Sequence, residues 1–174
     1  MSAHRRIRPG ADEFAPFYAG YVQQVPDGDI VEALIGGAEI AAALLGDLPD
    51  AIASRAYAPG KWTLKEVALH CADAERIFAY RALRIARGDS TPLPGWDEQA
   101  YAPQSGASVR AMESILDELH SVRESTVTLF SNLPSEAWTR RGSANGQAVS
   151  VRGLAWITAG HLLHHLGVIQ DRYL

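Results

Sequence analysis

The chain has 174 residues, of which 47% are apolar and 21% are charged, and this composition is typical of a single soluble globular domain. A formal net charge of −4 and a pI near 5.8 exclude the strongly basic surface of a typical nucleic-acid-binding protein. No apolar run is long enough to span a membrane, no apolar segment follows the arginines near the N-terminus, and the single cysteine excludes an internal disulfide. We therefore expect a cytoplasmic protein with neither a nucleic-acid nor a membrane partner.

Residues 1–26 form the first segment, in which Pro9, Pro16 and Pro26 interrupt any sustained helical period. The segment is nevertheless rich in large apolar side chains, which favour packing over free exposure to water. We predict an N-terminal arm that packs on a single helical domain formed by residues 27–174. The apolar side chains of this arm are Phe14, Phe17, Tyr18, Tyr21 and Val22.

Four stretches carry apolar residues at helical spacing, and each is bounded by helix start or stop signals. The clearest of them begins at Thr63, which forms the sequence pattern of a capping box with Glu66, and it ends before Gly88. Ser150 is the corresponding N-cap residue of the last helix. The predicted helices span residues 29–46, 63–87, 108–132 and 150–174.

The connection over residues 88–106 is much longer than a usual bundle loop, and it carries Trp96 and Tyr101. A long connection lets consecutive helices run parallel, and it can also cover a site. The next connection contains the pair Asn145 and Gly146, which favours a tight turn or a short hairpin. These features predict an all-α fold, a four-helix bundle with a long crossover between its second and third helices.

On two predicted helices, histidines stand at positions of the apolar stripe where leucine is usual. His161 and His165 lie one turn apart in the last helix, so both imidazoles project from one face. An isolated pair at this spacing is typical of ordinary hydrogen-bonded or surface histidines, but it also suits a divalent metal. His70 lies on the apolar stripe of the second helix and is the candidate third ligand. Three neutral imidazoles would leave a coordination position open for water or substrate, as in catalytic metal sites.

Several residues near His70 in sequence, or in the long connection, are candidates for the surroundings of this site. Glu66 and Asp73 can orient the ring of His70, or they can be ordinary surface carboxylates. Arg81, on the same helix face, can hold an anionic substrate group, or it can pair with Glu75 or Asp73. Three aromatic side chains can line a pocket or can simply pack: Trp62, Trp96 and Tyr101.

Several kinds of catalytic site are excluded by the sequence. The histidine pair has Leu162 where a zincin protease needs the glutamate of H-E-x-x-H. A carboxylate-bridged di-iron bundle would need Glu or Glu-x-x-His on several helices. The chain contains no G-x-S-x-G, G-x-G-x-x-G or P-loop motif.

The chain resembles the DinB-like superfamily, in its DinB/YfiT-type branch, from about residue 12 to its last residue. The resemblance implies the same bundle with a long crossover, frequent homodimers, and a divalent metal, often nickel or zinc. It places the metal ligands at His70, His161 and His165, whereas His164 matches a family histidine that is not a ligand. The segments that carry it are KWTLKEVALHCADAER (61–76), PLPGWDEQAY (92–101), TRRGSANGQAVSVRGLA (139–155) and GHLLHHLGVIQDRYL (160–174).

The resemblance implies two kinds of activity, a metal-dependent hydrolase and a transferase that uses a low-molecular-weight thiol. Either would act on a small-molecule substrate, with the metal as a Lewis acid or as a group that lowers the pKa of a bound water or thiol. The alternative is a non-catalytic bundle, a metal-binding or stress-responsive dimeric protein. This alternative stays open because the sequence shows no unambiguous general base or nucleophile.

Overall fold

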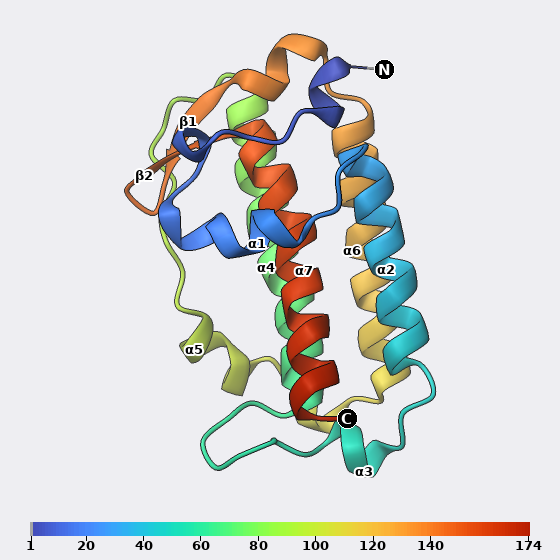
Figure 1. Ribbon diagram of the computed structural model, residues 1–174. Helices are drawn as coiled ribbons and strands as arrows, with labels where there is room; N and C mark the ends of the chain where they lie inside the picture. Colours follow the sequence, from blue (N-terminus) through green and yellow to red (C-terminus); the bar gives the residue numbers. More distant parts are fainter. Residues whose placement is uncertain (1) are drawn as a thin grey trace.

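The computed structural model describes residues 2–174, and four long helices dominate it (Figure 1). Among the described residues, no helix is both long and apolar enough to cross a membrane. The long helices are α2 (Ile30–Leu45), α4 (Leu64–Ala86), α6 (Met112–Ser131) and α7 (Val151–Arg172). The other elements are η1 (Ala3–Arg6), η2 (Ala11–Glu13), η3 (Pro16–Tyr18), α1 (Ala19–Gln24), α3 (Asp50–Ala53), α5 (Glu98–Tyr101), η4 (Ala102–Gln104), η5 (Ala107–Val109), η6 (Ser135–Thr139), β1 (Arg141–Ala144) and β2 (Gln147–Ser150).

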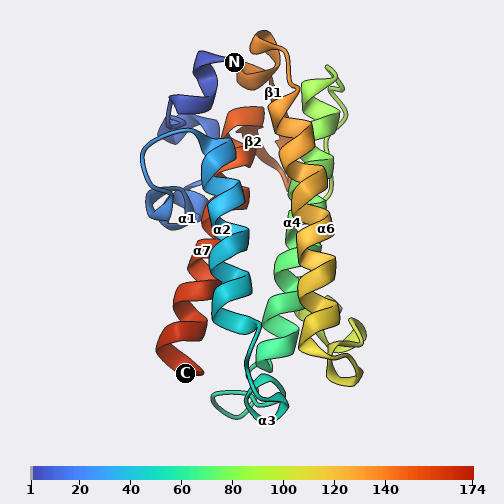
Figure 2. The ribbon, with the colours of Figure 1, turned by 90° about the vertical axis from the view of Figure 1, so that its right-hand side faces the viewer.

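The four long helices stand side by side, with α4 in contact with α6 and α7, and α2 in contact with the same two helices. α2 and α7 run in one direction, whereas α4 and α6 run in the opposite direction (Figure 1, Figure 2). The parallel helices α4 and α6 are joined by the long crossover, which returns along the outside of the bundle. The predicted four-helix bundle with a crossover between its second and third helices is therefore confirmed.

The ends of the helices follow the signals in the sequence, with one exception. At the start of α4, the Thr63 hydroxyl accepts a hydrogen bond from the Glu66 amide (3.2 Å), and the Glu66 carboxylate accepts one from the Thr63 amide (2.7 Å). This confirms the predicted capping box. α6 begins at Met112 rather than at the predicted residue 108. The reason is that Gly106 adopts a left-handed backbone conformation (φ 72°) and starts a separate short turn, η5.

The connection between α6 and α7 contains the antiparallel hairpin of β1 and β2, with Asn145 and Gly146 in its turn. Both residues have positive φ angles, 52° and 71°, which are typical of a type I′ turn. Strand β2 leads directly into α7, where the Ser150 hydroxyl accepts a hydrogen bond from the amide of Gly153 (2.8 Å). The predicted tight turn and the predicted N-cap of the last helix are both confirmed.

The N-terminal arm lies across α7 (Figure 1). Two glycines of α7 permit the close approach. A Cβ atom at Gly153 would lie 2.5 Å from the carbonyl oxygen of Glu13, and one at Gly160 would lie 2.0 Å from the carbonyl oxygen of Tyr21. Every residue of α7 from 153 to 162 is consequently buried. A helix covered on all sides has no single apolar stripe, which explains the near-continuous apolar sequence of this segment.

A buried carboxylate fixes the arm to the start of α7. Glu13 accepts hydrogen bonds from the Ser150 hydroxyl (2.7 Å), from the Gly10 amide (2.9 Å) and from the guanidinium of Arg152. Burial acts to raise the pKa of Glu13, but these hydrogen bonds outweigh it and hold the pKa below its ordinary value of 4.5. The division of the chain into an arm and a domain of residues 27–174 stays a prediction.

The core consists of two apolar clusters, one toward each end of the bundle, with polar side chains between them. A buried ion pair lies at this level, where Arg123 of α6 donates two hydrogen bonds to Glu75 of α4, at 2.8 and 2.7 Å. Arg123 also donates to the carbonyl of Leu34 in α2. Gly37 leaves room for this guanidinium, because a Cβ atom there would lie 3.3 Å from it. One arginine therefore connects three of the four long helices.

We expect Gly160→Ala to lower the free energy of unfolding by about 2 kcal/mol, because the added methyl group would overlap the carbonyl of Tyr21. Gly167→Ala is the matched control in the same helix, since no atom lies within 4 Å of a Cβ atom there. Its better helix propensity should raise stability by about 0.5–1 kcal/mol. Urea unfolding followed by circular dichroism measures both variants. Equal effects would contradict the close contact between the arm and α7.

We expect Glu13→Gln to lower the free energy of unfolding by about 2 kcal/mol at neutral pH, because it removes charged hydrogen bonds at a buried position. The folded pKa of Glu13 lies below its unfolded value, so the contribution of the carboxylate is complete above the unfolded pKa. It is lost as the pH falls through the folded pKa. The difference between wild type and variant should therefore shrink below a pH of about 4.5 in urea titrations.

Asp12→Asn is the control for this measurement. Asp12 pairs with Arg141 at an exposed position, where a salt bridge contributes little to stability. A stability loss in Glu13→Gln that is the same at every pH, or as small as that of Asp12→Asn, would show that the carboxylate of Glu13 does not hold the arm.

Candidate metal centre

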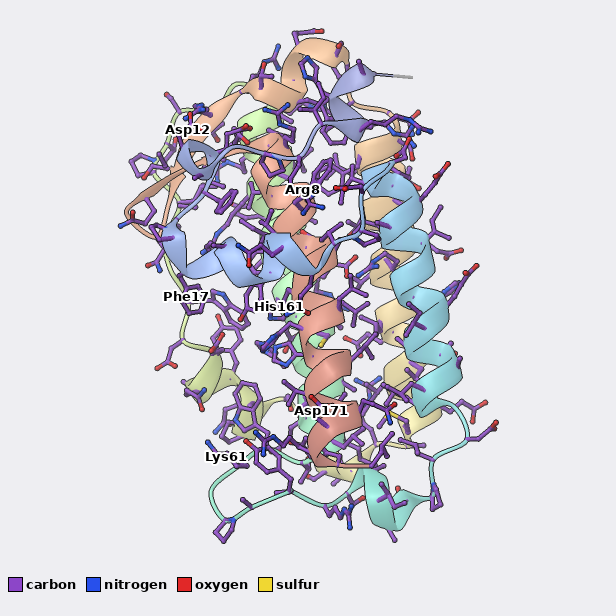
Figure 3. All side chains as sticks on the ribbon, in the orientation of Figure 1. Arg8, Asp12, Phe17, Lys61, His161 and Asp171 are labelled. Carbon is purple, nitrogen blue, oxygen red and sulfur yellow. The ribbon has the colours of Figure 1, made fainter. Side chains whose placement is uncertain are left out.

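The antiparallel packing of α4 against α7 brings three histidines together. His70 lies on α4, and His161 and His165 lie one turn apart on α7. The Nε2 atom of His161 is 3.1 Å from that of His70 and 3.2 Å from that of His165. Figure 3 shows His161 on α7 just below the N-terminal arm. The structure thus unites three residues that are far apart in the sequence.

The three ring nitrogens are spaced like the ligands of a single ion, all lying within 4.8 Å of one another. Around a tetrahedral ion with metal–nitrogen bonds of about 2.0–2.1 Å, neighbouring ligand nitrogens lie about 3.3 Å apart. Hydrogen bonding satisfies this arrangement poorly, because the Nε2 atom of His161 faces two other nitrogens and can serve as only one donor or one acceptor. The residues present therefore fit a divalent ion that prefers imidazole ligands.

Burial keeps the three imidazoles neutral. It lowers the pKa of His70 to about 4, and burial, followed by the repulsion that His70 and His164 would exert on a second positive charge, lowers the pKa of His165 to about 3. Burial, followed by repulsion from the neighbouring histidines, also holds the pKa of His161 well below 6.5. A neutral imidazole has the free lone pair that a metal ligand needs. All three rings are therefore in the ligand form at neutral pH.

Two of the three aromatic residues predicted near the site flank His70. The ring centroids of Trp62 and Trp96 lie 4.9 and 5.7 Å from that of His70, and the ring of Trp96 is stacked on it with an interplanar angle of 16°. Tyr101 is one step further away, since it contacts Trp96 at 5.1 Å rather than a histidine. The long crossover therefore contributes one wall of the site, as a covering connection would.

Two further aromatic residues contact the cluster and were not predicted from the sequence. Tyr21 of the arm and Phe78 of α4 make edge contacts with the ring of His161, at centroid distances of 5.4 and 5.6 Å. The apolar composition of the arm predicted that Tyr21 packs somewhere, but its position on α7 depends on tertiary contacts. Phe78 follows His70 by about two helical turns, so helical spacing was a usable signal for it.

The polar residues predicted near the site have other partners. Glu66 closes the capping box, and Asp73 lies 3.5 Å from an arginine on the same helix. Neither carboxylate hydrogen-bonds to a ring nitrogen of the three histidines within residues 2–174. Arg81 is buried and donates a hydrogen bond to the carbonyl of Pro94 (2.8 Å). It does not pair with Glu75, whose carboxylate takes part in the ion pair of the core.

A cavity of about 240 Å³ reaches the cluster at His165. His165 and His164 line it, and Lys61 and Gln99 lie on its walls. The ring of His164 lies 3.4 Å from the side-chain amide of Gln24, and partial burial lowers its pKa from 6.5. His165 is therefore the member of the cluster that a small molecule can reach from this cavity, whereas His70 and His161 are buried behind it.

Residues 34–169, most of the chain, match the family model described as DinB superfamily. The chain belongs to the DinB superfamily. Two relatives of this DinB protein carry the name "Putative metal-dependent hydrolase". The one from Oceanobacillus iheyensis is 28% identical over 126 residues, which cover 69% of this chain and 72% of the relative. The one from Bacillus pumilus is 28% identical over 134 residues, which cover 74% of each.

A solved structure has the same DinB fold. YfiT from Bacillus subtilis, described as "a probable metal-dependent hydrolase with an unusual four-helix bundle topology", superposes with a TM-score of 0.70. The match covers 95% of this chain and 91% of YfiT, at 15% sequence identity. This likeness concerns the fold alone, and with the family match it confirms the DinB-like bundle predicted from the sequence.

Proposed function

We propose that this DinB protein is a metal-dependent hydrolase that acts on a small molecule and uses a divalent ion, nickel or zinc, held by three histidines. The observation that carries the proposal is the convergence of the Nε2 atoms of His70, His161 and His165, with neighbouring atoms 3.1 and 3.2 Å apart. The names of the two relatives support the type of reaction.

Three imidazole ligands are the donor set of a catalytic rather than a structural site. Structural zinc sites use four protein ligands, and the described residues bring only these three together. When bound, such an ion acts as a Lewis acid and lowers the pKa of a water molecule. Leu162, at the position of a zincin base, is buried in the apolar core and supplies no carboxylate. A peptidase of the zincin type is therefore not part of the proposal.

The surrounding side chains hold the rings and bind the substrate. Trp62 and Trp96 restrict the ring of His70 by packing against it, which fixes the direction of its Nε2 lone pair. Lys61 and Gln99, whose side chains end in an ammonium group and an amide, line the cavity that reaches His165. We propose that these two groups bind the polar parts of the substrate.

Other predictions from the resemblance extend this proposal. A thiol-dependent transferase would use the same three histidines, because a thiol also loses its proton more readily at a metal ion. The identity of the ion, a low-molecular-weight thiol as co-substrate, a homodimer and a cytoplasmic location all stay predictions.

The metal content of the purified full chain, without an affinity tag, tests the site. We expect about one divalent ion per chain, and its loss in His70→Ala, His161→Ala and His165→Ala with helicity retained. His164→Ala is the matched control, because this histidine adjoins the cluster in sequence but does not belong to it. If nickel and zinc do not bind to wild type, or if His164→Ala loses the ion equally, the three-histidine site is wrong.

An assay of hydrolysis tests the proposed reaction. Hydrolysis of small esters and amides such as 4-nitrophenyl acetate should require the ion, stop on chelation, return when the ion is restored, and be absent from His161→Ala. Turnover only in the presence of an added thiol would replace the hydrolase with a transferase. A protein that binds the ion but catalyses neither reaction would favour the non-catalytic bundle.

A further inference from the structure

Arg81 is a buried arginine that makes no ion pair within residues 2–174. Only 3% of its surface is exposed, and one hydrogen bond, to the carbonyl of Pro94 at 2.8 Å, involves its guanidinium. The other buried arginine of this part of the chain, Arg123, differs in having a carboxylate partner, Glu75, at 2.7–2.8 Å.

A buried guanidinium normally needs a counter-charge. The group keeps its positive charge at every physiological pH and has five N–H donors, of which the carbonyl of Pro94 satisfies one. Burying such a charge without an anion is costly. Two less buried arginines, Arg5 and Arg152, each pair with a carboxylate. The surroundings of Arg81 are therefore suited to an anionic ligand.

A cavity of about 500 Å³ gives a ligand room beside Arg81. Segments that are far apart in the sequence form its walls: residues 15–18 of the arm, Trp96 and Glu98 of the crossover, and the turn of the β1–β2 hairpin. Figure 1 shows the arm, the crossover and the hairpin meeting on one side of α4 and α7, and Figure 3 shows Phe17 of the cavity at the edge of the molecule on this side. A volume of this size is typical of sites for small organic molecules.

The residues that line the cavity favour a ligand with a single negative charge and an apolar body. Tyr18 and Trp96 offer aromatic surface, and Asn145 and Gln147 offer side-chain amides. Glu98 is an exposed carboxylate on the same cavity, and its charge disfavours ligands with several negative charges, such as phosphate. A single carboxylate matches the planar fork of a guanidinium.

We propose that this cavity binds a small organic carboxylate, whose charged group pairs with Arg81 and whose apolar body packs against Tyr18 and Trp96. Trp96 also stacks on His70, with ring centroids 5.7 Å apart, so the ligand would share one aromatic wall with the histidine cluster. None of the three clustered histidines lines the cavity. Binding of the carboxylate should therefore not require a metal ion at those histidines.

Calorimetric titration of the full chain tests the requirement for a carboxylate. The probes are benzoate and phenylacetate, together with their neutral amides, benzamide and phenylacetamide. Each carboxylate should bind about tenfold or more tightly than its amide, both in the protein as purified and after chelator treatment. Inorganic phosphate should bind more weakly than either carboxylate, because Glu98 repels it. Amides that bind as tightly as the acids, or carboxylates that bind only when the ion is present, would overturn the proposal.

Substitutions test the residue assignment. Arg81→Gln should weaken benzoate binding about tenfold or more, whereas Arg84→Gln should not change it, because Arg84 pairs with Asp89 outside the cavity. Glu98→Gln is a second test at an exposed position, where unfolding is not a concern, and it should tighten benzoate binding. A folded Arg81→Gln with wild-type affinity, or an unchanged affinity in Glu98→Gln, would contradict the assignment.

Discussion

The packing of α4 against α7 is the contact on which the rest of the structure depends. His70 comes from one helix and His161 and His165 from the other, so three separate residues become a cluster only where these helices meet. Gly160 directly precedes His161 and lets the backbone of the arm reach α7 at the same level. Tyr21 of the arm therefore packs against the ring of His161. The arm also covers the outer face of α7 at the level where the inner face carries the histidines.

The polar groups of the core lie between two apolar clusters. The apolar clusters stabilise the fold, and the polar groups between them include the candidate metal ligands. Burial of apolar side chains toward each end of the bundle supplies the favourable free energy of folding. The imidazoles between them oppose folding unless they find partners, because burial removes them from water. The ion pair of Glu75 and Arg123 lies near the same level and is satisfied by two hydrogen bonds. Within residues 2–174 the three histidines have no carboxylate partner and contact one another through ring nitrogens that hydrogen bonding satisfies poorly, which is the physical reason to regard them as a ligand set.

Local patterns in the sequence were sufficient to predict the long helices, the capping box of Thr63 and the one-turn spacing of His161 and His165, because these features depend on residues close in sequence. The start of α6 was predicted too early, since apolar spacing does not reveal that Gly106 begins a separate turn. The sequence suggested that Arg81 can hold an anionic group and that Trp96 can line a pocket, but not that the arm and the hairpin complete the walls around Arg81. They depend on which distant segments meet, as do the contacts of Tyr21, and no local pattern encodes this.

X-ray absorption at the zinc edge, on the zinc-loaded full chain, tests most directly whether the three histidines form one metal centre. The structure predicts a first shell of nitrogen and oxygen atoms at about 2.0–2.1 Å, with the outer-shell scattering of three imidazole rings. It also predicts no sulfur ligand, because the sulfur of Cys71 is not among the ligand atoms that the described residues bring together, and burial raises the pKa of this thiol to about 12. A sulfur neighbour at about 2.3 Å, or a shell without imidazole scattering, would contradict the account.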